Sequence, residues 1–236
     1  MIKFEMHAHT KGGSPCGYAD AKTIVEDFLS QGYGGIVITN HYDKFNYENT
    51  FIGQSHKEKI DYFFSLYQGV KDLGDKEKLK VFYGVEVRDS LGDEYMLYGF
   101  KPKFLYDNKP LFLYTQKELF QMAEKENLFM YQTHPFRNGV KCGDPDYMHG
   151  AEIFNGHFHH YNNNEKADEF FVGKNLIRMV GTDYHRPHQP LTTHMEIPEN
   201  VNDEIALAEY LLSGKAKYFG DKEYYLEEVQ KYMGTR

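Results

Sequence analysis

The sequence is poor in several residue types, and each shortage excludes a class of protein. Its 236 residues include no tryptophan and only 2 cysteines, Cys16 and Cys142, too few for the disulfide framework of a small secreted protein. No segment approaches the about 18 apolar residues that suggest a membrane-spanning helix, and the first residues lack the apolar stretch of a signal peptide. We therefore expect a protein of the reducing cytoplasm with no membrane partner.

Basic charge is also scarce. The chain carries 27 Lys and Arg against 35 Asp and Glu, a net charge of −8, so there is no general basic field to attract extended nucleic acid. Hydrophobic residues make up 41% and aromatics 16%, which is typical of a globular chain rather than a disordered one. The length and the lack of a linker-like tract predict a single domain over residues 1–236.

Short apolar runs alternate with longer segments of helical periodicity. Strands are expected at residues 2–6, 35–39, 80–87, 94–100, 128–133, 151–154, 176–181 and 216–219. Helices are expected at 20–31, 55–73, 115–126, 163–172, 203–212 and 222–233, and an irregular loop with two prolines at 101–110. Strands that alternate with helices of this length indicate βα units and a mostly parallel sheet, an α/β fold.

Five of the apolar runs end in side chains that can bind a metal. These side chains are His7 and His9, His41, Glu86, His134, and Asp183 and His185. Parallel α/β sheets carry their active sites at the carboxyl ends of the strands, where such residues meet. Side chains at i and i+2 share a face of a strand. His7 and His9 can therefore converge on one point, and so can Asp183 and His185.

The chemistry of these residues indicates a polynuclear or at least binuclear metal centre. Imidazole and carboxylate together suit Zn, Mn or Fe, whereas Ca and Mg prefer all-oxygen ligands. A carboxylate such as that of Glu86 can bridge two metals about 3.5–4 Å apart, as in two-metal phosphatases.

The ordered set of motifs resembles the PHP (polymerase and histidinol phosphatase) family. The matching motifs are His7-Ala8-His9-Thr10, Thr39-Asn40-His41, Gly84-Val85-Glu86, His134-Pro135 and Gly181-Thr182-Asp183-Tyr184-His185. The resemblance implies a distorted (β/α)7 TIM-like barrel with two or three divalent metal ions. It assigns one metal to His7, His9, Glu86 and Asp183. It assigns a second to Glu86 and His134, and a third to His41 and His185.

Three positions depart from the family pattern. Cys16 lies in a segment where the family often has an acidic or histidine ligand, and it is either a thiolate ligand or a structural cysteine. Met96 stands where the family commonly places a histidine on the strand after the glutamate, and Asn40 replaces a frequent Asp. We therefore expect the second and third metal sites each to be one protein ligand short, with water or phosphate filling the gap.

Few cationic side chains are available to hold a phosphate. Arginine suits this task, and Arg137 and Arg186 follow the metal-capable histidines closely, which makes both candidates for catalysis and substrate binding. Lys11 is a third candidate for substrate binding. Surface ion pairing is the alternative role for the arginines.

Another histidine-rich stretch follows the run at 151–154. Residues 157–160 are either a substrate-facing loop or a solvated one, and Glu152 and Asn155 are expected to contact the metal ligands.

The resulting prediction is a metal-dependent phosphoric ester hydrolase, a phosphatase or phosphodiesterase of the histidinol-phosphatase type. Its substrate would be a small phosphorylated molecule, attacked by metal-activated water. Two alternatives stay open. The first is an amidohydrolase-type deaminase or amidase, which usually needs a bridging lysine that no strand end here presents. The second is a catalytically idle metal-binding regulatory module.

Overall fold

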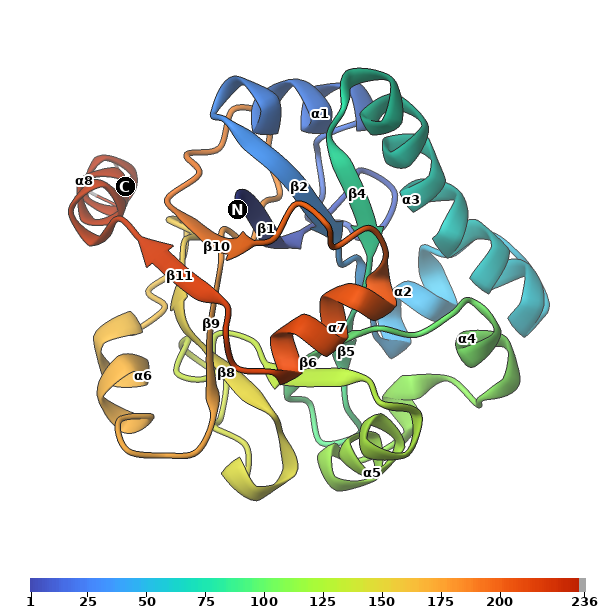
Figure 1. Ribbon diagram of the computed structural model, residues 1–236. Coiled ribbons are helices and arrows are strands. Elements are labelled where there is room, and N and C mark those ends of the chain that lie inside the picture. The colour runs from blue at the N-terminus through green and yellow to red at the C-terminus, as the bar shows by residue number, and fades with distance from the viewer. Residues whose placement is uncertain (234–236) are drawn as a thin grey trace.

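The computed structural model describes residues 1–233 and arranges the strands in two sheets within a mixed α/β architecture (Figure 1). In hydrogen-bonded order, the first sheet contains β11 (Lys217–Gly220), β10 (Thr193–Ile197), β1 (Ile2–Ala8), β2 (Tyr33–Ile38) and β4 (Lys80–Tyr83). The second contains β3 (His41–Tyr42), β5 (Val85–Arg88), β6 (Glu94–Tyr98), β7 (Phe129–Gln132), β8 (Gly150–Asn155) and β9 (Ile177–Gly181). The expected α/β class is confirmed.

The two sheets adjoin at two places. At one edge the chain passes from β4 to β5 through Gly84, whose N–H donates to the Ile38 carbonyl at 2.9 Å. At a second place Ala8, at the end of β1 in the middle of the first sheet, forms an isolated parallel bridge with Tyr184, which follows the edge strand β9 of the second sheet. Because β1–β2–β4 and β7–β8–β9 are parallel ladders, their carboxyl ends can present side chains to a shared interior.

Helices surround this interior. They are α1 (Ala21–Ser30), α2 (Lys44–Asn49), α3 (His56–Glu77), α4 (Lys103–Asp107), α5 (Gln116–Glu126), α6 (Asn164–Phe170), α7 (Glu204–Leu212) and α8 (Lys222–Met233). Figure 1 shows α1, α3, α5 and α6 on the outside of the strands, with α7 across the end that faces the viewer. Within residues 1–233 no helix combines the length and apolarity that a bilayer span requires.

Helix boundaries follow from local capping. Asp20 accepts from the Thr23 N–H at 2.9 Å and begins α1. The predicted capping box at the start of α5 is present, with Thr115 accepting from the Glu118 N–H and Glu118 accepting from the Thr115 N–H. Each cap satisfies donors that the first helical turn leaves unpaired.

The structure corrects several predicted elements. Residues 101–110 are not an irregular loop throughout, because α4 forms between Pro102 and Pro110. Pro102 occupies the N-cap position, where a missing N–H costs no helical hydrogen bond. The expected strand at 80–87 is divided at Gly84, and the strand β10 and the short elements β3 and α2 were not predicted.

Buried phenols form part of the interior beneath the carboxyl ends of the strands. The hydroxyls of Tyr98 and Tyr131 lie 2.9 Å apart, and both contact the Met6 carbonyl oxygen. Both rings are fully buried. Packing and hydrogen bonding together therefore fix the position of both rings. We call this rigid pair of phenols the floor of the interior.

The floor makes Gly84 a sensitive position. A Cβ there would lie 2.3 Å from Cδ1 of Tyr98, and the held ring cannot move aside. Gly84→Ala should lower the free energy of unfolding by about 1–3 kcal/mol, the usual cost of overpacking, as measured by urea denaturation.

Gly69→Ala provides the matched control. A Cβ at Gly69, inside α3, would have Ala21 Cβ as its nearest neighbour at 4.0 Å. Removing an interior helical glycine stabilises by up to about 1 kcal/mol. Equal stability of the two variants would contradict the rigid floor.

Candidate metal centre

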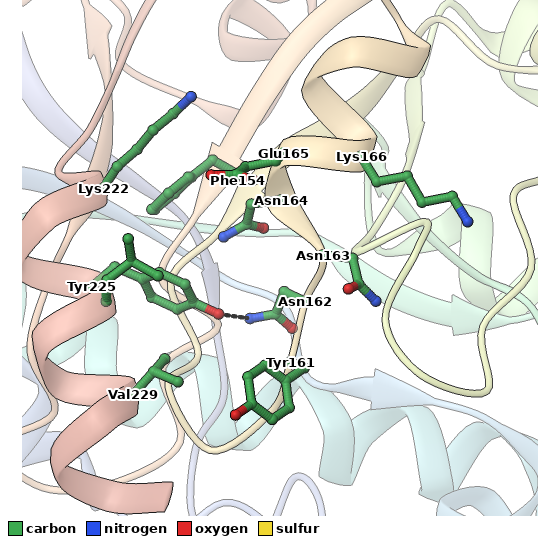
Figure 2. A pocket seen from close by; sticks show the side chains of 11 residues that line it. Phe154, Tyr161, Asn162, Asn163, Asn164, Glu165, Lys166, Lys222, Tyr225 and Val229 are labelled. Carbon is green, nitrogen blue, oxygen red and sulfur yellow. Dashed lines mark hydrogen bonds between the residues drawn. The ribbon is translucent and has the colours of Figure 1, made fainter.

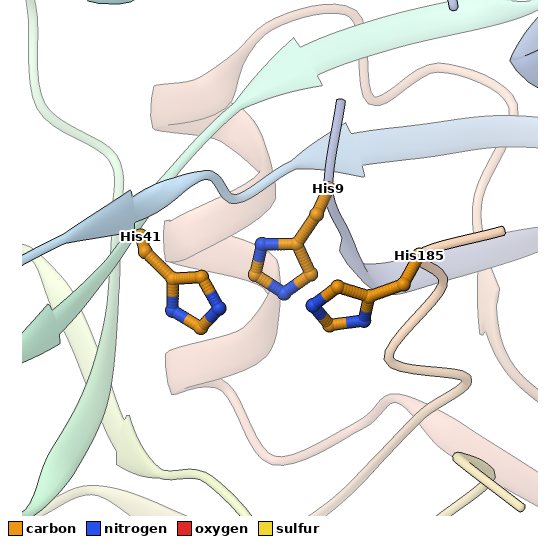
Figure 3. A group of neighbouring side chains, drawn as sticks. All are labelled: His9, His41 and His185. Carbon is orange, nitrogen blue, oxygen red and sulfur yellow. The ribbon is translucent and has the colours of Figure 1, made fainter. Parts of the chain in front are cut away.

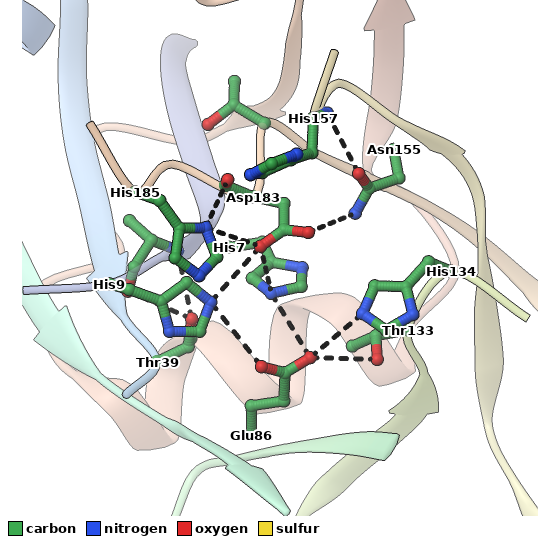
Figure 4. A network of polar contacts seen from close by, with 12 residues as sticks. His7, His9, Thr39, Glu86, Thr133, His134, Asn155, His157, Asp183 and His185 are labelled. Carbon is green, nitrogen blue, oxygen red and sulfur yellow. Dashed lines mark hydrogen bonds and ion pairs between the residues drawn. The ribbon is translucent and has the colours of Figure 1, made fainter. Parts of the chain in front are cut away.

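The structure gathers all seven predicted metal ligands in one place. Figure 4 shows the imidazoles and carboxylates of these residues other than His41 pointing toward a common centre, and Figure 3 shows His41 beside His9. The predicted ligands come from the carboxyl ends of β1, β7 and β9 and from within β3 and β5, and they are His7, His9, His41, Glu86, His134, Asp183 and His185. Six of the side chains are at most 7% exposed, and His41 is 17% exposed. Residues distant in sequence thus form one buried cluster.

Glu86 is the hub of the cluster. Its Oε1 lies 3.4 Å from His7 Nε2 and 3.3 Å from His134 Nε2. Its Oε2 lies 3.5 Å from His9 Nε2 and 2.7 Å from His41 Nδ1. A carboxylate that faces imidazoles on both oxygens has the arrangement that a bridging ligand needs.

Asp183 is a second convergence point. Its Oδ1 lies 3.2 Å from His7 Nε2, 3.4 Å from His9 Nε2 and 3.2 Å from His185 Nδ1. The backbone of Asp183 has φ +50°, and that of His134 has φ +30°. Such backbone conformations are costly for residues other than glycine and cluster at functional sites.

The donor atoms satisfy the chemistry of a metal site. Overlapping groups of three donors lie within 4.8 Å of one another, among them His7–His9–Asp183 and His7–Glu86–His134. Several buried ring nitrogens have no hydrogen-bond partner: His7 Nε2, both ring nitrogens of His9 and His134 Nδ1. Leaving a buried polar atom unsatisfied costs about 1–3 kcal/mol, and coordination of a cation would remove that cost at the nitrogens that face the centre. The residues therefore fit divalent metal ions.

Charge compensation sets the protonation of the cluster. Burial by itself raises the pKa of Glu86, but the charges of His41 and His7 outweigh it and hold that pKa well below its usual range. Burial lowers the pKa of His41, yet Glu86 and Cys16 hold it well above its usual value. His9 has two imidazole neighbours, and burial followed by their charges lowers its pKa.

A second layer of polar contacts orients the ligands. Glu152 Oε1 lies 3.0 Å from His7 Nδ1, and Glu152 Oε2 accepts from the His134 N–H at 2.9 Å. Asn155 donates to both Glu152 and Asp183. A carboxylate on the far nitrogen of a ligating histidine fixes its tautomer and orientation. The expected contacts of Glu152 and Asn155 with the metal ligands are confirmed.

Glu94 is a cluster residue that the sequence analysis missed. Its Oε2 lies 3.6 Å from His134 Nε2, and it forms a donor group with His41 and Glu86. The ligands were predicted at the carboxyl ends of strands, and Glu94 begins a strand. Because β6 is antiparallel to both its neighbours, its amino end lies at the site. Met96 lies two residues further along β6, directly opposite Glu86 in the ladder. Alternation along this strand is the signal that could have identified Glu94.

A cleft of about 550 Å³ opens above the cluster. Arg137 and Arg186 both line it, together with Arg88. Arg137 is held by Asp183 at 2.5 Å and by Asn155 and Asn162. Lys11, by contrast, is exposed and does not line the cleft.

The segment 157–160 also borders this cleft. His157, His159 and His160 line it, and His157 is 7% exposed. The ring of His159 stacks on Tyr232 of α8, with centroids 3.9 Å apart. The segment thus faces the cleft rather than being fully solvated.

A separate hollow of about 320 Å³ lies between α6 and α8 (Figure 2). It contains none of the metal-capable histidines. Asn162 joins the two cavities, because it donates to Tyr225 at 3.2 Å in this hollow and accepts from Arg137. Asn162 therefore links α8 to Arg137 in the lining of the main cleft.

No family model matches the chain, and no curated protein matches its sequence. Solved structures do match its fold. A two-domain protein from Bacteroides vulgatus that contains a predicted PHP-like metal-dependent phosphoesterase matches with a TM-score of 0.62 at 18% identity, covering 98% of this chain and 69% of the other. The chain has the fold of PHP-like phosphoesterases. The resemblance drawn from the motifs is confirmed at the level of the fold.

Two further matches widen the range of chemistry found on this fold. The lesion-specific endonuclease EndoQ from Pyrococcus furiosus matches with a TM-score of 0.61 at 12% identity, over 92% of this chain and 57% of that one. An amidohydrolase from Chromobacterium violaceum with bound sulfate and no metal matches with a TM-score of 0.55 at 10% identity, over 94% and 99% of the two chains. At these identities the likeness concerns the PHP-like fold alone.

Glu152 offers a test of the metal centre that leaves the ligands intact. Glu152→Gln removes the carboxylate that orients His7, so metal affinity should fall by about 10- to 100-fold. The metal affinity is measured by competition between the protein and a chromogenic chelator for the same ion.

Glu124→Gln is the control for that change. Glu124 also pairs with a histidine ring, His149 at 2.7 Å, but this pair lies outside the cluster. Its metal affinity should match that of the unchanged protein. A Glu152→Gln affinity equal to that of Glu124→Gln would refute the orienting role.

Proposed function

We propose that the protein is a metal-dependent phosphoric ester hydrolase that acts on a small phosphorylated substrate. The observation that carries this proposal is the position of the buried donor cluster, which lies at the base of a cleft lined by three arginines. The cluster supplies ligands for divalent cations, and the arginines supply donors for an anion. Both features are needed to bind and cleave a phosphoester.

The proposed metal ligands follow the geometry of the cluster, with two or three ions of Zn, Mn or Fe. One ion would be held by His7, His9, Glu86 and Asp183, and a second by Glu86 and His134 with Glu94 close by. His41 and His185 would hold a third. When bound, such ions lower the pKa of a coordinated water toward neutrality and neutralise phosphoryl oxygens. We also propose that the two sheets form the distorted (β/α)7 barrel of a single domain.

The protein's own residues would position the substrate. Arg186 lies at the cleft edge, where its guanidinium is over the Tyr18 ring at 4.6 Å from the centroid. Arg137 lies deeper and already binds Asp183. We assign Arg186 to capture of the phosphoryl group, and Arg137 to contact with the same group while it holds Asp183 in place. Both suit the planar bidentate geometry of phosphate recognition.

The alternatives have less support from the site. An amidohydrolase-type centre usually needs a bridging lysine, and the cleft lining contains none. The case for a catalytically idle module is that the second and third metal sites each lack a protein ligand. Glu94 weakens that case, because it supplies a donor atom near His134.

The size of the substrate is a separate question. The cleft volume lies within the range of about 300–1,000 Å³ for small-molecule sites, which favours a small phosphorylated compound. The endonuclease among the structural matches keeps nucleic acid as the competing substrate class.

Metal removal tests the proposed reaction. Treatment with EDTA should abolish phosphate release from p-nitrophenyl phosphate, because the donor cluster then lacks its cations, and Mn²⁺ or Zn²⁺ should restore it. A panel that adds bis(p-nitrophenyl) phosphate and an amide distinguishes the classes. Ammonia release from the amide would favour the amidohydrolase reading, and bound metal without turnover would favour the idle module.

Arg186→Ala tests the phosphate-binding assignment. A hydrogen bond to a charged group contributes about 1.5–3 kcal/mol, and at the solvent edge we expect the lower end, a rise in KM for a phosphomonoester of about tenfold. Lys11→Ala is the control, since Lys11 does not line the cleft and its removal should leave KM unchanged. Unaltered kcat and KM in Arg186→Ala would show that the assignment is wrong.

A further inference from the structure

We propose that the thiolate of Cys16 is a ligand of the metal ion at the cleft mouth, together with His41 and His185, and that it makes this site prefer Zn over Mn. The inference rests on the metal-dependent function proposed above, and it adds a ligand and a metal preference to it. Cys16 lines the cleft, and its Sγ lies 3.5 Å from His41 Nε2. His185 lines the same cleft.

The ring orientations show which nitrogens remain for a metal. His41 Nδ1 faces Glu86 Oε2 at 2.7 Å, and His185 Nδ1 lies 2.9 Å from the Asp183 carbonyl oxygen. Ligating histidines commonly donate their other ring N–H to a carboxylate or a backbone carbonyl in this way. The Nε2 atoms of both rings are therefore left for coordination, and the His41 Nε2 is the atom that contacts Cys16.

His9 lies close enough to both rings to share a cation with them. Figure 3 shows the His9 ring between those of His41 and His185. The ring centroids lie 4.4 Å and 4.2 Å from its own. His9 is fully buried, and neither of its ring nitrogens has a hydrogen-bond partner. An unpartnered nitrogen in a buried ring is costly, and a cation near the three rings would accept its lone pair.

The segment that carries Cys16 is fixed against the site. The Tyr18 N–H donates to the His185 carbonyl at 2.8 Å, and the Lys11 N–H donates to the Ala19 carbonyl at 2.8 Å. Ser14 Oγ lies 3.1 Å from Cys16 Sγ. The sulfur is thus tied to the same backbone that positions His185.

The nearby Asn40 holds the start of this segment. Its Oδ1 accepts from the Thr10 N–H at 2.8 Å, and a Cβ at Gly13 would lie 2.2 Å from its side-chain carbon. The amide that replaces the family's aspartate therefore anchors the Cys16 segment. The close approach at Gly13 leaves this turn little room to shift.

A thiolate changes the metal preference of the site. Cysteine sulfur with imidazole nitrogen is a typical zinc donor set, whereas carboxylate-rich sites accept manganese. The carboxylates of Glu86 and Asp183 are buried within the cluster, and that of Glu94 lies at the cleft on the His134 side. The rings of His41 and His185 and the sulfur of Cys16 lie together at the other end of the cluster. The two ends of one cluster should therefore differ in metal preference.

Titration of the metal-free protein with Co²⁺ tests the proposal. A thiolate ligand produces a sulfur-to-cobalt charge-transfer band in the near ultraviolet, which nitrogen and oxygen ligands do not. We expect this band in the unchanged protein and its loss in Cys16→Ser, which should keep the visible bands of nitrogen- and oxygen-bound cobalt. Zn²⁺ should displace the band, and an excess of Mn²⁺ should not.

Cys142→Ser is the matched control. Cys142 is half-buried and contacts the Gly143 carbonyl rather than a histidine, so its substitution should keep the band. Zn²⁺ should also slow alkylation of Cys16, but not of Cys142, by iodoacetamide in the unchanged protein, which provides a second measurement without a substitution.

The outcomes separate this inference from the proposed function. Cobalt binding without the ultraviolet band, or with a band that survives in Cys16→Ser, would overturn the thiolate ligand while metal-dependent phosphatase activity stands. Failure to bind Co²⁺ or Zn²⁺ at all would overturn both.

Discussion

Compensation of buried charge around Glu86 is the constraint on which the site depends. Moving a carboxylate out of water costs several kcal/mol unless cations surround it, and both Glu86 and Asp183 are almost fully buried. In the metal-free protein this compensation comes from protonated imidazoles, with the pKa of His7 and of His41 held well above the usual value despite burial. Metal ions would replace those protons, so binding must release protons and depend on pH. Folding and metal binding are therefore coupled through the same few side chains.

The two-sheet architecture explains how such a cluster can be preorganised. No strand supplies more than two of the donors, and the strands that carry them are held by ladders whose register fixes each side chain. The pair of phenols at Tyr98 and Tyr131 supports the cluster from below. Contacts from Glu152 and Asn155 support it from the side. The donors are thus set by rigid elements, while the segments at 157–160 and at Cys16 shape access.

The parts of the site that could be predicted from the sequence follow simple periodicity. Ends of parallel strands share an edge, so His7 and Asp183 could be placed together without coordinates. Glu94 escaped because it begins a strand, and no local pattern shows that β6 runs antiparallel. Lys11 was predicted to bind substrate from its neighbouring glycines, yet it is exposed and is not among the residues that line the cleft. In the fold, α4 was missed because prolines that flank a short helix resemble prolines in a loop.

The charge that lines the cleft differs in sign from the net charge of the chain, and the charge of the cleft bears more directly on an anionic substrate. The whole chain carries −8, yet three of its five arginines line the cleft. Part of this charge is already balanced, because Arg88 pairs with Glu94 and Arg137 with Asp183. Arg186 has an aromatic ring rather than a carboxylate beneath it. A cleft focuses the field of the charges that line it, so small anions would be drawn in while the acidic exterior repels long polyanions.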